Sequence, residues 1–178
     1  MIKPRGSTTI FIESMLIFID TEFTDFKKPE LISIGLVSDD GQHEFYAELP
    51  VNQARCNDFV LATVLPLLGK VQGAQCSFAE LKERLTQWLA QFAVSTPVTI
   101  CFDFPGDWQL LCHALGDEIP EWLTGQNVYP YINQTTYQMF FIENRLQEHH
   151  ALNDAKANRH AYEATKAKND TMKFRKSR

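Results

Sequence analysis

The sequence of 178 residues predicts an α/β domain in which a mixed β-sheet is covered by helices. Three strand-like segments come first, an amphipathic helix then leads to a fourth strand, and helical patterns follow. A strand that returns after such a helix is expected to lie parallel to the first strand, so the sheet should combine an antiparallel meander with parallel strands. Thirteen Phe, five Tyr and three Trp argue against disorder over most of the chain.

The meander is predicted from three apolar segments. Residues 15–20 (MLIFID) form a continuous apolar run that ends in an acid, as a buried strand does where it reaches a polar surface. Residues 31–37 (LISIGLV) and 43–49 (HEFYAEL) are predicted as the next two strands, and residues 39–42 (DDGQ) between them are typical of a hairpin turn. Residues 51–74 are ambiguous and predict a short helix and a loop.

A capping-box pattern at residues 77–80 (SFAE) begins a helix whose apolar residues share one face as far as about residue 93. Pro97 then opens a short strand over residues 98–102. Further helices are predicted at about residues 107–115, ending at Gly116, at roughly residues 135–146, and at residues 151 to about 167. No internal repeat and no second core are evident.

The charge of the chain is unevenly distributed, with a formal net charge of −11 over residues 1–154 and +6 over residues 155–178. We expect one domain over residues 1–168, followed by a basic, mobile tail at residues 169–178. The tail either follows a phosphate backbone or is a solvated end. An acidic body is unusual for a protein that binds nucleic acid by charge alone, but it suits a protein whose acids hold divalent cations.

Two classes of protein are disfavoured by composition. The four cysteines form no CxxC pair, which argues against a zinc cluster. No apolar run approaches the roughly 18–20 residues of a membrane span, so a cytoplasmic protein without a membrane partner is predicted.

Asp20 and Glu22 lie two residues apart at the end of the first predicted strand. Residues at this spacing on an extended chain point to the same face, so both carboxylates can aim at one point. Two oxygen donors held in this way suit a hard cation such as Mg²⁺ or Mn²⁺. The alternative is a solvated acidic turn.

Two further acids lie around the start of the predicted helix 107–115. Asp107 follows Pro105-Gly106 and is either an ordinary helix N-cap or an acid of the same site. Asp103 follows the strand that is expected beside the first one, and it is either a turn former or a member of the same pocket.

His149 precedes Asp154 by five residues, a spacing that does not place both on one helical face. They can face one site if His149 lies in the loop before the first helical turn. That arrangement fits a base poised over a metal site to which Asp154 contributes a carboxylate, whereas the alternative is a surface histidine and a helix-start acid.

Together these segments resemble the DEDDh family of 3′–5′ exonucleases, which have the ribonuclease H-like fold and include oligoribonuclease and ribonuclease T. The resemblance spans about residues 16–164, through DTEFTDF, ICFDFPGDWQLL and HHALNDAKAN. The most specific match is the H-x-A-x-x-D-A arrangement over residues 149–155. The DTEFTDF segment and the strand after it are most similar to small bacterial 3′–5′ exoribonucleases.

The resemblance implies the roles of five residues. Two divalent ions, Mg²⁺ or Mn²⁺, would be bound by Asp20, Glu22, Asp107 and Asp154, with His149 as general base. The implied reaction is hydrolysis of single-stranded RNA or short oligonucleotides from the 3′ end to nucleoside 5′-monophosphates. Relatives often form homodimers, and the resemblance implies the same assembly here.

Three residues next to the first acids are predicted to contact the substrate: Thr21, Phe23 and Phe26. The two phenylalanines would stack on the terminal base, where stacking contributes roughly 1–3 kcal/mol per base. Their alternative role is ordinary packing.

The sequence departs from the family pattern at Asp103, which stands where many relatives have Asn. We expect Asp107 to be the metal ligand because the helix start and the following Leu110-Leu111 match better. His150 is a second candidate base, but the five-residue spacing favours His149. Three other functions stay open: an exodeoxyribonuclease on single-stranded DNA, a non-catalytic nucleic-acid-binding module, and a structural protein whose acids are caps and turns.

Overall fold

The computed structural model describes residues 14–93, 97–116 and 118–163. The five strands are β1 (Met15–Phe23), β2 (Leu31–Ser38), β3 (Glu44–Glu48), β4 (Val98–Phe102) and β5 (Leu123–Asn127). The α-helices are α1 (Phe78–Ala90), α2 (Pro105–Leu115), α3 (Gln134–Asn144) and α4 (Ala151–Ala161). Short 3₁₀ or π turns occupy Gln53–Arg55, Val60–Val64, Leu65–Leu67 and Tyr129–Tyr131. The predicted domain boundary at residue 168 and the basic tail at residues 169–178 lie outside the described residues.

The strands form one mixed sheet in the order β3-β2-β1-β4-β5, which confirms the predicted α/β class. β1 pairs antiparallel with β2, and β2 pairs antiparallel with β3. On its other side β1 pairs parallel with β4, and β4 with β5. This arrangement is consistent with a ribonuclease H-like fold, and it makes β1 the central strand.

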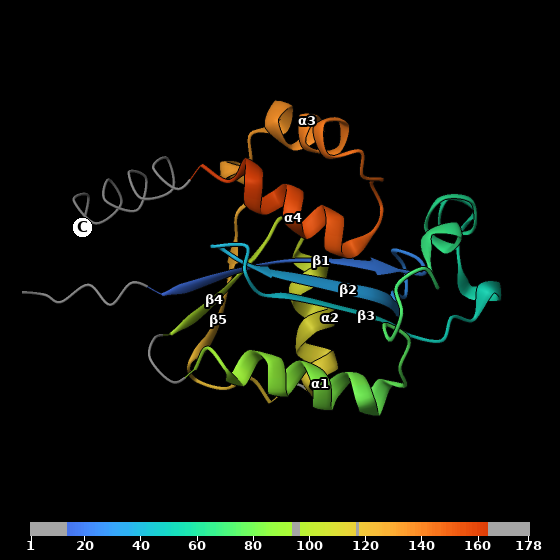
Figure 1. Cartoon of the computed structure of the whole chain (residues 1–178). Coiled ribbons are helices and arrows are strands. Elements are labelled where there is room, and N and C mark those ends of the chain that lie inside the picture. The colour runs from blue at the N-terminus through green and yellow to red at the C-terminus, as the bar shows by residue number, and fades with distance from the viewer. Residues whose placement is uncertain (1–13, 94–96, 117, 164–178) are drawn as a thin grey trace, which may run out of the picture.

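The helices lie on both faces of the sheet (Figure 1), with α1 and α2 on one face and α3 and α4 on the other. β1 alternates between these faces, as a pleated strand must. Ile17 and Ile19 pack with the apolar side chains of α1 and α2, while Phe18 packs with Ala155 of α4. Asp20 continues the phase of Phe18, so the α4 face changes from apolar to acidic toward the end of β1.

A glycine on β2 allows α4 to approach the sheet closely. Gly35 pairs directly with Asp20, and a Cβ built on Gly35 would lie 2.3 Å from the backbone nitrogen of Leu152. The first turn of α4 therefore rests on the part of the sheet that carries the first acid. None of the described helices combines the length and apolarity needed to cross a membrane.

The structure corrects four predicted boundaries. β1 continues to Phe23, so Asp20 and Glu22 belong to the strand and do not follow it. α2 begins at Pro105, because proline suits the first helical position. α3 ends at Asn144, with Arg145 as its left-handed cap. α4 ends at Ala161, because Tyr162 adopts an extended conformation and forms a β-bridge with Ile132.

One strand was missed. β5 (LTGQN) has no apolar alternation, and only Leu123 in it is buried. It lies at the edge of the sheet, where a single hydrogen-bonded neighbour is enough to hold it. α1 ends at Ala90, three residues before its predicted end at about residue 93. Two local predictions are confirmed: Ser77 and Glu80 form the capping box of α1, and Gly116 ends α2 in a left-handed conformation with φ 92°.

Candidate active site

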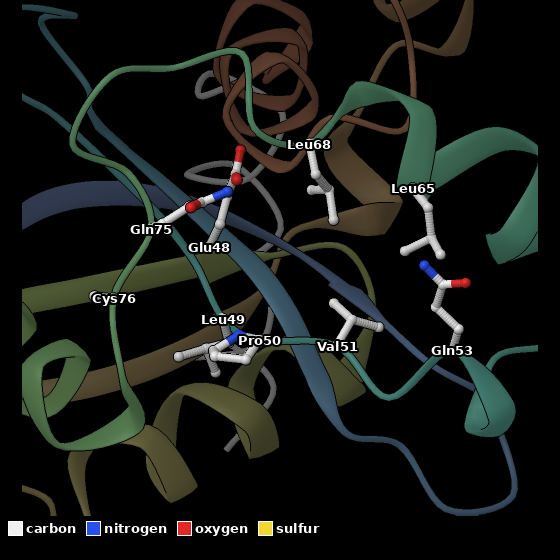
Figure 2. Close-up of a pocket in the computed structure, with 9 residues that line it drawn as sticks. All are labelled: Glu48, Leu49, Pro50, Val51, Gln53, Leu65, Leu68, Gln75 and Cys76. Atoms are coloured by element: carbon white, nitrogen blue, oxygen red, sulfur yellow. The ribbon is translucent and has the colours of Figure 1, made fainter.

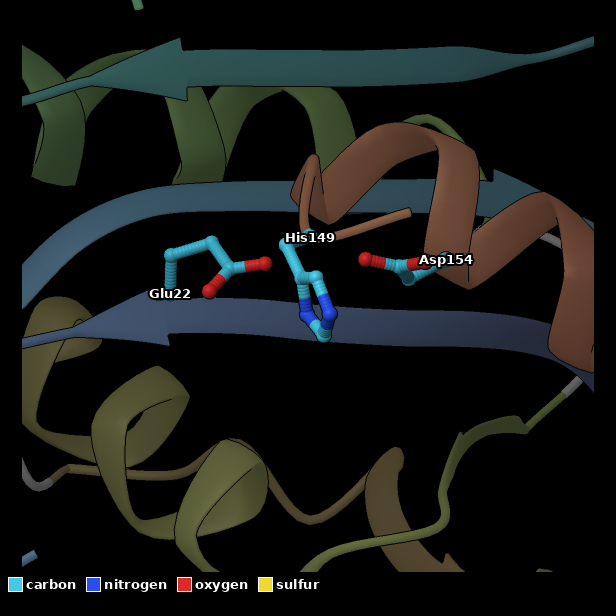
Figure 3. A group of neighbouring side chains, drawn as sticks. All are labelled: Glu22, His149 and Asp154. Atoms are coloured by element: carbon cyan, nitrogen blue, oxygen red, sulfur yellow. The ribbon is translucent and has the colours of Figure 1, made fainter. Parts of the chain in front are cut away.

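Side chains from four segments lie close together near the C-terminal end of β1, on the sheet face that α4 covers. The segments are β1, the turn after β4, the start of α2, and the start of α4 with the loop before it. Within each of two groups, one potential ligand atom per residue lies within 4.8 Å of the others. The first group is Glu22, His149 and Asp154, and the second is Asp20, Asp103 and Asp107. Figure 3 shows the first group, with the His149 ring between the Glu22 and Asp154 carboxylates. The five residues predicted from the family pattern therefore lie together, although they span 135 positions of sequence numbering from 20 to 154.

Asp20 and Glu22 are placed by β1 itself. Their spacing puts both on the face that α4 covers, as the alternation of the strand predicts. The register of β1 against β2 shifts between Glu22 and Phe23, where the regular pairing ends. Such irregularities are common beside active sites because they redirect side chains.

Asp107 lies in the first turn of α2 and is only 1% exposed. Its carboxylate accepts hydrogen bonds from the Thr21 hydroxyl at 2.6 Å and from the Phe104 backbone N–H at 3.3 Å. It is the third residue of the helix, where the N-terminal end of the helix dipole favours a negative charge. The N-cap alternative for Asp107 is therefore wrong: Phe104 is the N-cap, and Asp107 accepts the hydrogen bond of its backbone N–H from the third helical position.

Asp154 lies in the first turn of α4 and is buried against α3. The Tyr137 hydroxyl donates a hydrogen bond to its carboxylate at 3.3 Å. Tyr137 was not identified from the sequence. No local signal marks it, because its proximity to Asp154 depends on how α3 and α4 pack.

His149 lies in the loop immediately before α4, the position it needs in order to face the same site as Asp154, with a left-handed φ of 63°. The Phe59 ring packs edge-on against its imidazole, with ring centroids 4.9 Å apart. The His150 ring instead stacks on the Tyr46 ring, with ring centroids 4.4 Å apart. Of the two neighbouring histidines, only His149 belongs to a group of potential ligands.

Asp107 and Asp154 are buried and Asp20 and Glu22 are half-buried, and this removal from water raises the pKa values of all four carboxyls. Burial is the main cause for each of them. It raises the pKa of Glu22 to about 8, and those of Asp107 and Asp154 to about 7. The pKa of Asp20 rises well above its usual value, through burial and then through the charges of the neighbouring acids.

This donor set suits a hard divalent cation. Carboxylate oxygens with one imidazole and no thiolate are typical ligands of Mg²⁺ or Mn²⁺. Over the ranges that the structure describes, no Lys or Arg forms an ion pair with these acids; Arg55 pairs with Glu30 and Lys156 with Glu44. Cations would supply the positive charge that the acids lack, so the residues fit the metal centre that the resemblance implies.

The predicted substrate contacts lie beside the acids but differ in environment. Thr21 is buried, and its hydroxyl is engaged by Asp107. Phe26 is 73% exposed and packs edge-on against Phe23 at 5.1 Å. Phe104, which the sequence did not single out, stacks on Phe23 at 5.9 Å. We call Phe23, Phe26 and Phe104 the aromatic cluster.

A pocket of about 570 Å³ lies elsewhere, between β3 and the loops that follow it (Figure 2). None of the predicted site residues lines it. Its buried acid, Glu48, already accepts hydrogen bonds from the Tyr46 hydroxyl at 3.0 Å and the Gly69 backbone N–H at 2.8 Å. The candidate chemistry therefore belongs to the acidic groups and not to this pocket.

Neither a scan against protein-family models nor a search of curated proteins found a match to this chain.

Proposed function

We propose that this protein is a metal-dependent 3′–5′ exoribonuclease that hydrolyses single-stranded RNA or short oligonucleotides to nucleoside 5′-monophosphates. The observation that carries the proposal is the convergence of four carboxyls and one imidazole at the end of β1. These are Asp20, Glu22, Asp107, Asp154 and His149. Their order and spacing are those of the DEDDh exonucleases.

The metal centre would be held by the four carboxylates. Two divalent cations at such a site neutralise charge on a phosphodiester and act as Lewis acids. The burial of the acids supports this role, because carboxyls with pKa values raised to about 7 or 8 are costly to ionise without a cation.

In the proposed reaction, the oxygen of a water molecule bonds to phosphorus while the bond from phosphorus to the 3′ oxygen breaks. The 3′ oxygen of the shortened chain takes a proton from solvent and becomes a 3′-hydroxyl, and a nucleoside 5′-monophosphate leaves. His149 accepts the proton of the attacking water, and its position between Glu22 and Asp154 supports this assignment. The packing of Phe59 holds the imidazole in that position.

The aromatic cluster would bind the terminal base. Phe26 presents an exposed ring, while Phe23 and Phe104 support it from within the same cluster. Base stacking on such rings contributes roughly 1–3 kcal/mol per base and tolerates any sequence. The Thr21 hydroxyl donates to Asp107. Thr21 would therefore act on substrate binding indirectly, by holding a carboxylate that binds the metal.

The test is digestion of a 5′-labelled RNA oligonucleotide with Mg²⁺ or Mn²⁺, beside a DNA oligonucleotide of the same sequence. We expect a ladder that shortens progressively from the 3′ end and release of 5′-monophosphates. Internal cleavage of RNA would contradict the proposal, and faster digestion of the DNA would indicate an exodeoxyribonuclease.

Two variants test the proposed roles of Asp20 as a metal ligand and His149 as general base. Asp20→Asn should fold normally and slow digestion at least about 100-fold, because changes to residues that merely support metal ligands already cost 10–100-fold. His149→Ala should slow turnover about 10²–10⁴-fold while metal binding is retained. Digestion by Asp20→Asn at the parent rate would show that the site is wrong.

A further inference from the structure

Asp103 is a fifth acid in the site, outside the family pattern. It follows the last residue of β4, and its carboxylate lies in the same group as those of Asp20 and Asp107. Its Oδ1 atom is buried and has no hydrogen-bond partner. The backbone N–H groups of Asp103 and Phe104 act on this carboxylate, as in a turn, but Oδ1 is still left without a partner. A buried, unpartnered oxygen of this kind calls for an explanation.

Asn158 supplies an independent observation. It lies on α4 one turn after Asp154, so both side chains share the helix face that covers the acids. Asn158 is 1% exposed, and neither its amide nitrogen nor its amide oxygen has a hydrogen-bond partner. Burial raises the pKa of Asp103, and the nearby Asn158 amide is among the groups that oppose this rise. The Asn158 side chain therefore lies close enough to the Asp103 carboxylate to favour its charged form, although the two side chains form no hydrogen bond.

This arrangement is costly without a ligand. A buried polar group left without a partner is destabilising, and more so if it is charged. Here one carboxylate oxygen and a whole side-chain amide are unpartnered at one place, next to two other acids. A cation bound by the acids would give Asp103 a partner and would order it against the Asn158 amide.

We propose that Asp103 is a fifth carboxylate ligand, which completes with Asp20 and Asp107 the donor set for one divalent cation, and that Asn158 orients it. Two groups of potential ligands then serve two ions, and Asp103 belongs to the second group. The inference rests on the proposed function for the presence of a metal centre. It adds a ligand that the family pattern does not contain.

The test is calorimetric titration of metal-free protein with Mn²⁺, in the absence of nucleic acid. Asp103→Asn should weaken the binding of one of two ions at least about 10-fold, or remove it from the stoichiometry. Asp39→Asn is the matched control, because it removes the same charge from an exposed position at the β2–β3 turn. It should bind Mn²⁺ like the parent.

A double-mutant cycle tests the orienting role. Asn158→Ala should weaken Mn²⁺ binding about 3-fold alone but add nothing to Asp103→Asn, since groups that act together are non-additive. An additive loss would show that Asn158 acts independently of Asp103. Urea unfolding checks each fold, and Asp103→Ser, measured in the same way, replaces Asp103→Asn if the latter does not fold.

The outcomes separate the two proposals. If Asp103→Asn binds both ions like Asp39→Asn while Asp20→Asn does not, Asp103 is not a ligand and the four-acid site stands alone. If Asp103→Asn loses an ion but the parent leaves RNA intact, the ligand assignment holds and the exonuclease proposal is wrong. A parent that binds no Mn²⁺ overturns both.

Discussion

The Thr21 hydroxyl has a defined partner, Asp107. Thr21 can therefore either support the charge of Asp107 or contact the substrate directly, and the two roles can be told apart. The hydroxyl donates a hydrogen bond of 2.6 Å to Asp107, whose pKa is raised to about 7 mainly by burial and is held down in part by this bond. A hydrogen bond to a charged group contributes about 1.5–3 kcal/mol. Thr21 thus supports the charged form of Asp107.

We predict that Thr21→Val raises the pKa of Asp107 further and weakens Mn²⁺ binding about 10-fold at pH 7, since the bond to the carboxylate is lost. The loss should shrink toward pH 9, where Asp107 is ionised in either protein. Calorimetric titration over this pH range measures it. Thr21→Ser keeps the hydroxyl and should resemble the parent. A raised KM for RNA with unchanged Mn²⁺ affinity would instead favour a direct substrate contact.

At the scale of elements, the site depends on how closely α4 approaches β2. Gly35 pairs with Asp20, and the backbone of Ala151 and Leu152 lies where a side chain on Gly35 would be. The absence of a Cβ at this position lets α4 bring Asp154 and the preceding His149 to the acids of β1. A packing contact therefore determines the geometry of the site.

We predict that Gly35→Ala destabilises the protein by about 1–3 kcal/mol, the usual cost of overpacking, and weakens Mn²⁺ binding more than 10-fold, because α4 must move away from β1. Urea unfolding and Mn²⁺ titration measure the two effects. Ser77→Ala is the control: it removes the cap of α1, on the opposite face of the sheet, and should cost about 1 kcal/mol with no change in Mn²⁺ affinity. Equal losses of Mn²⁺ affinity in both variants would contradict this account.

Local signals account for what the sequence predicted well. The apolar run that ends at Asp20, the hairpin turn at residues 39–42 and the Ser77–Glu80 capping box each involve neighbouring residues. β5 was not predicted because it is an edge strand, and an edge strand need not be apolar. Tyr137 depends on helix packing, which no short pattern encodes. Asn158 carried a weak signal, as a polar residue one turn after Asp154 in an alanine-rich helix.

At the scale of the whole molecule, the acidic groups make folding dependent on pH. Asp and Glu have pKa values near 4 in an unfolded chain, whereas burial raises those of Glu22, Asp107 and Asp154 to about 7 or 8 in the folded protein. Between these values the folded state binds more protons than the unfolded state. The stability that these groups contribute is complete below about pH 4 and is lost as the pH rises through about 7 to 8.

We predict that the free energy of unfolding of the metal-free protein falls as the pH rises from about 5 to about 8, because the buried carboxyls ionise without a counter-charge. Saturating Mg²⁺ or Mn²⁺ should reverse this trend, since cations bind the ionised acids of the folded state only. Urea unfolding at half-unit pH steps, with chelator and with metal, measures both curves. Asp20→Asn should flatten the metal-free curve and abolish most of the metal effect. Stability that rises with pH in chelator, or is unaffected by metal at pH 8, would mean that these acids do not form a metal centre.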